Sequence, residues 1–226
     1  MDEFDMRKRR QQFFIENRKH LNSNLFAKHR STEDDSEDQS MKEQMRLFLE
    51  AQRDVLIENL KTKTFDKVLS SLIAIRNVMS VSQEIKELPL DDFFELGLLD
   101  PVVQCLKPEL NSQCKEIPEE AVWIIANASC CESEYLSSIA QTGIFQIFHF
   151  YLANEIYESL FYNILWTLAN FVTESIQFRT LIFKEGLFQS IFKISSLVRK
   201  TQNRTREVIC WFFEACMFSG NFPVPQ

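Results

Sequence analysis

The feature that most constrains the fold of this chain is a long internal repeat. Three segments begin with glycine and continue into apolar residues, at spacings of 46 and 43 residues, and three tryptophans recur at spacings of 43 and 45. The glycines are Gly97, Gly143 and Gly186, and the tryptophans are Trp123, Trp166 and Trp211. The two series are in phase, because a glycine follows the tryptophan by 20 residues in both complete cases. Units of this length bury their apolar faces against their neighbours, so the sequence predicts a stacked, repetitive fold.

Composition indicates that the repeated units are helical. The 226-residue chain contains only four Gly, too few for a turn-rich β protein, and its hydrophobic content of 45% is enough for a substantial core. The repeated glycine is predicted to occupy a sharp turn where φ is positive or where close packing excludes a side chain. A period of 43 to 46 residues is the length of an armadillo or HEAT unit. We therefore expect an all-α, right-handed armadillo-repeat solenoid.

Three regions are predicted along the chain. Residues 1–30 form a flexible basic arm, because residues 7–30 hold eight Lys or Arg against the single acid Glu16. Residues 31–46 form a flexible acidic linker that lacks large apolar residues in its first ten positions. Residues 47–226 form the repeat-containing body, and everything after the arm holds 17 basic and 28 acidic residues, a formal net charge of −11. The armadillo units are expected at about 50–110, 111–153, 154–198 and, incomplete, 199–226.

Two of the tryptophans are followed by asparagine one helical turn later, and this pairing is typical of a peptide-binding surface. Trp123 and Asn127, like Trp166 and Asn170, are four residues apart and share a helix face. A single such tryptophan is more often a core residue, but core packing gives no reason for the carboxamide. We expect exposed indoles with gaps that accept the stems of Lys or Arg, and asparagines that bind an extended peptide backbone. Glu174, on the face of Asn170, is placed to pair with a cation.

The segments AVWIIAN and NILWTLANFVTES, and the stretch around Trp211, resemble the second, third and fourth armadillo repeats of the importin α family. The resemblance implies a groove that binds basic nuclear localisation signals, with Glu174 as the acid that pairs with the key lysine. Ala215 departs from the family pattern, which has a third asparagine four residues after the tryptophan. The groove residues implied by the resemblance are Trp123, Asn127, Trp166, Asn170, Glu174 and Trp211.

The basic arm resembles a second part of the same family. Residues 7–30, RKRRQQFFIENRKHLNSNLFAKHR, match the importin-β-binding segment without a gap. On charge alone, a solvated tail or a nucleic-acid arm is the preferred interpretation, but the ungapped match and the repeats downstream favour importin β. Because the cluster around Lys28 is tethered to the body, we also expect it to occupy the groove and inhibit it. The arm residues with these roles are Arg7, Lys8, Arg9, Arg10, Arg18, Lys19, Lys28 and Arg30.

The sequence thus predicts a nuclear-import adaptor that shuttles between cytoplasm and nucleus. Its expected partners are importin β and cargo proteins with basic localisation signals, without direct binding to nucleic acid or membrane. The chain has no phosphate-cradling glycine loop, nucleophile motif or metal-ligand cluster, so neither catalysis nor a cofactor is expected. The six cysteines are expected to be buried thiols in a reducing compartment. The alternative is a shortened importin-α-like scaffold that binds importin β or other partners without carrying cargo.

Overall fold

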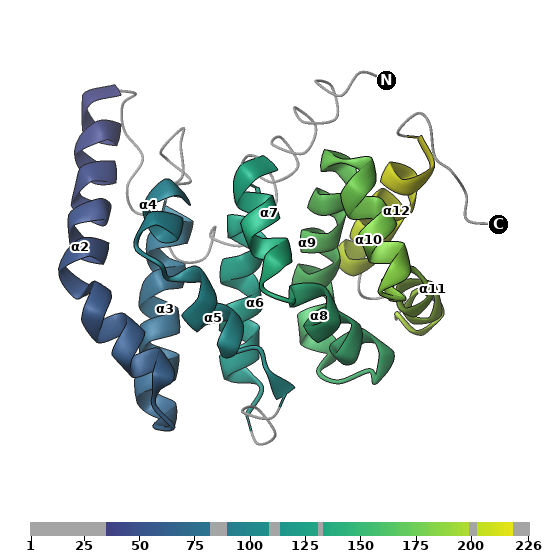
Figure 1. The fold of residues 1–226 in the computed structure, drawn as a ribbon, viewed down its shortest axis with the longest axis horizontal. Helices are drawn as coiled ribbons and strands as arrows, with labels where there is room; N and C mark the ends of the chain where they lie inside the picture. The colour runs from purple at the N-terminus through teal and green to yellow at the C-terminus, as the bar shows by residue number, and fades with distance from the viewer. Residues whose placement is uncertain (1–34, 82–89, 109–113, 131–132, 199–202, 219–226) are drawn as a thin grey trace.

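The computed structural model describes residues 35–81, 90–108, 114–130, 133–198 and 203–218, and within these ranges the regular elements are helices (Figure 1). A first pair of helices is followed by three groups of three, in which a short helix, a second helix and a longer third helix succeed one another. The first pair is α2 (Asp35–Lys61) and α3 (Phe65–Val81). The three groups are α4 (Leu90–Glu95), α5 (Leu99–Gln104) and α6 (Glu116–Ala128); α7 (Ser133–Gln141), α8 (Ile144–Ala153) and α9 (Phe161–Glu174); and α10 (Ile176–Lys184), α11 (Leu187–Leu197) and α12 (Asn203–Phe218). A 3-10 helix, η2 (Glu158–Leu160), leads into α9.

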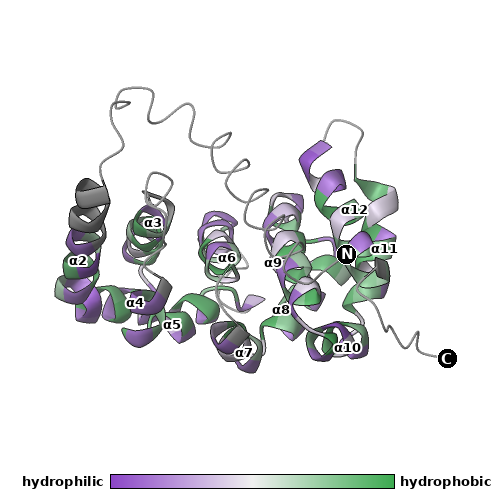
Figure 2. Cartoon of the chain, turned by 90° about the horizontal axis from the view of Figure 1, so that it is seen from above, coloured by the Kyte–Doolittle hydropathy of each residue, from purple (hydrophilic) through white to green (hydrophobic). Residues whose placement is uncertain are grey.

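The third helices of successive groups lie side by side and form one layer of the molecule. In Figure 2, α3, α6, α9 and α12 follow one another along one side, and α4, α5, α7 and α10 lie along the other. The contacts between helices agree, since α3 packs on α6, α6 on α9, and α9 on α12. Any side chain repeated at one position of the third helix is therefore presented along a single surface.

The repeated glycines form the turns between the first and second helix of each group, as predicted. Gly97, Gly143 and Gly186 have φ of 70°, 80° and 75°, in the left-handed region that a residue with a Cβ rarely adopts. The amide of Gly186 donates to the carbonyl of Phe183 at 3.1 Å, and the amide of Gly97 donates to the carbonyl of Phe94 at 3.0 Å, both within the range usual for such bonds. Gly186 is also in close packing, because an added Cβ would lie 3.1 Å from Cε1 of His149.

The core runs continuously between the two layers, and contacts between successive groups hold it in register. Buried aromatic residues on the second and third helices fill it, among them Phe145, Phe148, Phe171 and Phe212. The hydroxyl of buried Tyr151 donates to the carbonyl of Leu106 at 2.9 Å, across a sequence separation of 45 residues. Because this separation is one repeat, the bond joins equivalent places in neighbouring units.

The predicted flexible linker at 31–46 is wrong for residues 35–46, which belong to α2. The helix runs from Asp35 to Lys61 and so continues well beyond the predicted linker. The later part of the segment also contributes to the core, because Met45 is 9% exposed and Leu49 is fully buried. Apolar anchoring at one end thus extends the helix into the acidic stretch.

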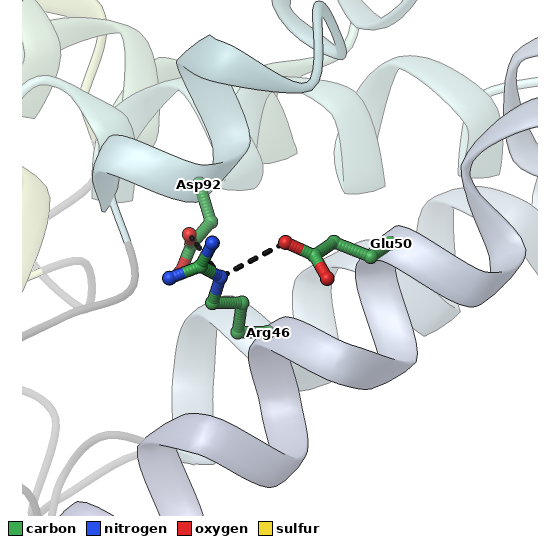
Figure 3. A network of polar contacts seen from close by, with 3 residues as sticks. All are labelled: Arg46, Glu50 and Asp92. Carbon is green, nitrogen blue, oxygen red and sulfur yellow. Dashed lines mark hydrogen bonds and ion pairs between the residues drawn. The ribbon is translucent and has the colours of Figure 1, made fainter.

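A polar contact fixes α2 to the first three-helix group. Nε of Arg46 lies 2.9 Å from Oε1 of Glu50 and 3.7 Å from Oδ1 of Asp92, the latter on α4 (Figure 3). Glu50 and Asp92 hold the pKa of Arg46 above its usual value, mainly through the hydrogen bond that Arg46 donates to the carboxylate of Glu50. Arg46 is more than half exposed, so solvent screens the contact and its main effect is on orientation. No helix in the described part of the chain is long and apolar enough to cross a membrane.

Candidate functional site

An aromatic row crosses the layer of third helices. Trp123 lies on α6, Tyr162 and Trp166 lie on α9, and Trp211 lies on α12. The rings of Tyr162 and Trp166 stack with centroids 6.3 Å apart, and those of Trp166 and Trp211 are 5.2 Å apart. Trp123 and Tyr162 line the same pocket. The structure therefore brings the three predicted tryptophans together on neighbouring helices, and it adds a tyrosine that the repeat period does not reveal.

The exposure expected for the indoles is wrong at Trp166. This residue is only 4% exposed and belongs to the buried core, whereas Trp123 and Trp211 are half-buried. The reason is that α9 and α12 pack closely enough for the indoles of Trp166 and Trp211 to touch. The gap expected there for a lysine stem is filled by the second indole.

The side chain of Arg76 occupies the face of Trp123. Its guanidinium carbon lies 4.9 Å from the ring centroid, within the range of a cation–π interaction. Its Nε also forms an ion pair with Oε2 of Glu120, on the same helix as the tryptophan, and both side chains are mostly buried. The chain thus provides its own cation, with a carboxylate partner, where the sequence predicts one from a ligand.

The two predicted groove asparagines, Asn127 and Asn170, are buried. Their carboxamides were expected to bind only a ligand, and this is wrong for Asn170, which forms a hydrogen bond within the chain. Asn170 is fully buried, and its Nδ2 donates to Oγ of Ser129 at 2.8 Å, from α9 to the end of α6. Asn127 is 4% exposed. In the described part of the chain, Nδ2 of Asn127 and Oδ1 of Asn170 have no hydrogen-bond partner. Each asparagine therefore retains hydrogen-bonding capacity beneath the row, although burial at present keeps it from solvent.

The remaining predicted positions divide between the edge of the row and the core. Glu174 is the last residue of α9 and is half-buried. Ala215, which stands where the family pattern has an asparagine, is 1% exposed on α12. The predicted arm, including Arg7 to Arg10, Arg18, Lys19, Lys28 and Arg30, lies outside the described residues.

A pocket of about 220 Å³ opens beside Trp123. It is lined by Trp123 from α6, by Tyr162 and Asn163 from the first turn of α9, and by Arg204 and Thr205 from the first turn of α12. Burial raises the pKa of Tyr162 to about 12, so its hydroxyl stays neutral at physiological pH. Sequence reasoning missed four of these residues because none belongs to the repeated W-x-x-x-N pattern.

No metal site is indicated in the described residues, and two of the cysteines there are unreactive. No group of three His, Cys, Asp or Glu residues there could hold a metal ion. Burial raises the pKa of the Cys105 and Cys216 thiols to about 12, which keeps both protonated and unreactive. The cysteine prediction is wrong for Cys210, which is exposed, while Cys114 and Cys130 are half-buried.

Comparisons with known structures identify the fold. One similar structure is a designed armadillo-repeat protein in complex with the peptide (KR)4, which is 20% identical, with a TM-score of 0.64 and coverage of 77% of this chain and 68% of that chain. A second, computationally designed for modular peptide recognition, is 19% identical with the same TM-score and coverage. A third, an engineered protein, is 11% identical with a TM-score of 0.62, and the match covers 89% and 80% of the two chains.

Comparisons with protein-family models and with curated proteins found no match. The structural likeness shows that the chain folds as an armadillo-repeat solenoid, which confirms the fold expected from the repeat period. At this level of identity it shows the fold alone.

Proposed function

We propose that the chain is a peptide-recognition adaptor of the importin α type, which binds extended basic segments across α6, α9 and α12. The observation that carries the proposal is the aromatic row itself, to which three successive units each contribute a tryptophan. Because successive units repeat along the solenoid, an extended ligand lying across them meets one aromatic side chain at each step. Armadillo-repeat scaffolds support such a role, since one similar structure contains a designed protein with the basic peptide (KR)4.

The packing of the row determines how such a ligand can bind. Trp166 and Trp211 are in contact, so a lysine stem does not fit between them in this arrangement. The ligand is expected to contact the half-buried indoles of Trp123 and Trp211 and to place a cation near the carboxylate of Glu174. Nδ2 of Asn127 and Oδ1 of Asn170, which have no hydrogen-bond partner in the described part of the chain, become accessible to a ligand only if neighbouring side chains move aside. These features predict weaker binding than a row with fully exposed indoles and accessible asparagines would give.

A binding titration tests the proposal. Fluorescein-labelled (KR)4 is titrated with the full chain, and fluorescence anisotropy is compared with that of a neutral peptide of equal length. We expect saturable binding of the basic peptide and a loss of about tenfold in affinity in Glu174→Lys, because the substitution replaces an attractive contact by a repulsive one.

The matched control is Glu134→Lys, an exposed position on α7 away from the row. It changes the net charge by the same amount and should leave the affinity nearly unchanged. Equal losses in both variants would mean that the peptide responds only to overall charge. No saturable binding of (KR)4 would reject peptide recognition by this surface.

The proposal extends to nuclear import through the resemblance of residues 7–30 to the importin-β-binding segment. On this view the arm docks to importin β, the groove carries cargo with a basic signal, and the protein shuttles between cytoplasm and nucleus. A pull-down of importin β with the full chain, compared with a chain that lacks residues 1–30, tests the docking step. Capture that is the same for both chains would reject it.

Two observations favour a second candidate, a scaffold that binds importin β or other partners without carrying cargo. Arg76 already occupies the face of Trp123, and Ala215 cannot supply a third carboxamide. Both reduce the capacity of the row for a basic signal. The two candidates differ in the titration above, because a scaffold of this kind would capture importin β but leave (KR)4 unbound.

A further inference from the structure

The pocket beside Trp123 has walls of a different character from the rest of the aromatic row. Trp123 and Tyr162 provide aromatic surface, and Asn163 and Thr205 provide polar side chains. Arg204 provides the only charge among the lining residues, since burial keeps Tyr162 neutral. The charge among the lining residues is therefore positive, although Glu207, exposed on α12, also acts electrostatically on Tyr162 without lining the pocket. A positive charge here disfavours a lysine or arginine side chain of the ligand.

Arg204 differs from Arg76, the other arginine beside Trp123. Arg76 is paired with Glu120, which neutralises it. Arg204 is half-buried, and within the described part of the chain it has no hydrogen bond or ion pair. A partly desolvated guanidinium without a carboxylate gains most from an anionic partner, and its planar donor fork matches a carboxylate in geometry. Its position in the first turn of α12 adds the positive potential of the helix N-terminus.

The geometry points to an acidic side chain of the bound peptide as the occupant of this pocket, with its carboxylate on Arg204 and its methylene groups between Trp123 and Tyr162. This inference rests on the proposed function, because it assigns one side chain of the ligand that the row binds. Asn163 and Thr205 can donate to the remaining carboxylate lone pairs. A lysine or arginine in the same place would be repelled by Arg204.

The pocket at Arg204 and the predicted cation site at Glu174 then select side chains of opposite charge. Asn163 and Glu174 lie 11 residues apart on α9, so the pocket and the predicted cation site are separated by about 16 Å along the helix. An extended peptide that crosses α9 directs successive side chains to opposite sides and can reach both edges. The preferred ligand is therefore a basic peptide with one acidic residue at a fixed position, rather than an unbroken run of basic residues.

A peptide scan tests this inference. Each residue of (KR)4 is replaced in turn by Glu and, in a parallel series, by Ala, and the affinities for the full chain are measured by fluorescence anisotropy. At one position we expect the Glu peptide to bind about five- to tenfold more tightly than the matching Ala peptide, which is the gain of a charge-assisted hydrogen bond. The gain should disappear in Arg204→Gln, survive in part in Arg204→Lys, and remain in Arg206→Gln, an exposed control on the same helix.

Three other results are decisive. If the basic and Ala peptides bind but no Glu position is preferred, the pocket assignment is wrong and the proposed function stands. If the preference persists unchanged in Arg204→Gln, with a circular dichroism spectrum like that of the parent chain, the acid binds elsewhere and the assignment is again wrong. If none of the peptides bind, the proposed function fails and this inference fails with it.

Discussion

Replacing Arg76 with alanine should lower the stability of the chain and raise the affinity of the aromatic row for a basic peptide. The guanidinium carbon is 4.9 Å from the centroid of Trp123, and the ion pair with Glu120 joins side chains that are 18% and 20% exposed. A cation–π contact contributes about 0.5–2 kcal/mol, and a partly buried ion pair adds a similar amount. We expect a free energy of unfolding lower by about 1–2 kcal/mol, and a Tm lower by roughly 3–6 °C for a chain of this size.

The same substitution should strengthen binding of a basic peptide. Removing Arg76 frees one face of Trp123 for a ligand cation and leaves the carboxylate of Glu120 beside it. If the ligand regains most of the lost cation–π energy, the affinity for (KR)4 should rise by about three- to tenfold. Fluorescence anisotropy measures the affinity and thermal unfolding followed by circular dichroism measures the stability.

Arg46→Ala is the matched control for this prediction. It removes an arginine ion pair on α2, away from the aromatic row, where both partners of the pair with Glu50 are at least 40% exposed. Stability and peptide affinity should both change little. An Arg76→Ala chain that binds (KR)4 no better than the parent, or less well, would refute the idea that Arg76 competes with a ligand for Trp123.

The other predictions concern the turns, the arm and the thiols. Gly186→Ala should destabilise the chain by more than Gly97→Ala. Both substitutions force a Cβ into a positive-φ turn at a cost of about 1–2 kcal/mol, but only the Cβ at position 186 would also meet a ring atom, at 3.1 Å. Equal losses of stability in urea unfolding would contradict the packing argument. Deleting residues 1–30 should tighten binding of (KR)4, and an unchanged Kd would reject inhibition by the arm. In native protein at about pH 8, iodoacetamide should modify exposed Cys210 but not Cys105, whose pKa of about 12 keeps it protonated. Mass spectrometry measures the extent of modification at both cysteines. Fast modification of Cys105 would show that its thiol is accessible and contradict the prediction.

The repeat period was the part of the sequence that predicted most of the structure. It identified equivalent positions, so the positive φ of Gly186 and the shared layer of Trp123 and Trp166 followed from spacing alone. It also contained an unused signal. Arg76 pairs with Glu120 across 44 residues, so a search for complementary side chains one repeat apart would have found this contact.

Other features were beyond the reach of spacing, because the period does not give the distance between neighbouring helices. The burial of Trp166 depends on how closely α9 and α12 approach. The pocket at Arg204 depends on which first turns face Trp123, and those turns carry no repeated residue. The helical start of α2 at Asp35 depends on apolar anchoring further along the same helix, which composition within a ten-residue window does not reveal.

The central claim is that an extended basic peptide binds on the aromatic row. The chain has only three tryptophans, and all of them belong to this row, so intrinsic tryptophan fluorescence reports on no other surface. Titration with unlabelled (KR)4, which has no aromatic residue, should change the intensity or wavelength of the emission with the same Kd that anisotropy gives. Saturable binding by anisotropy with an unchanged tryptophan emission would place the peptide elsewhere and contradict the account.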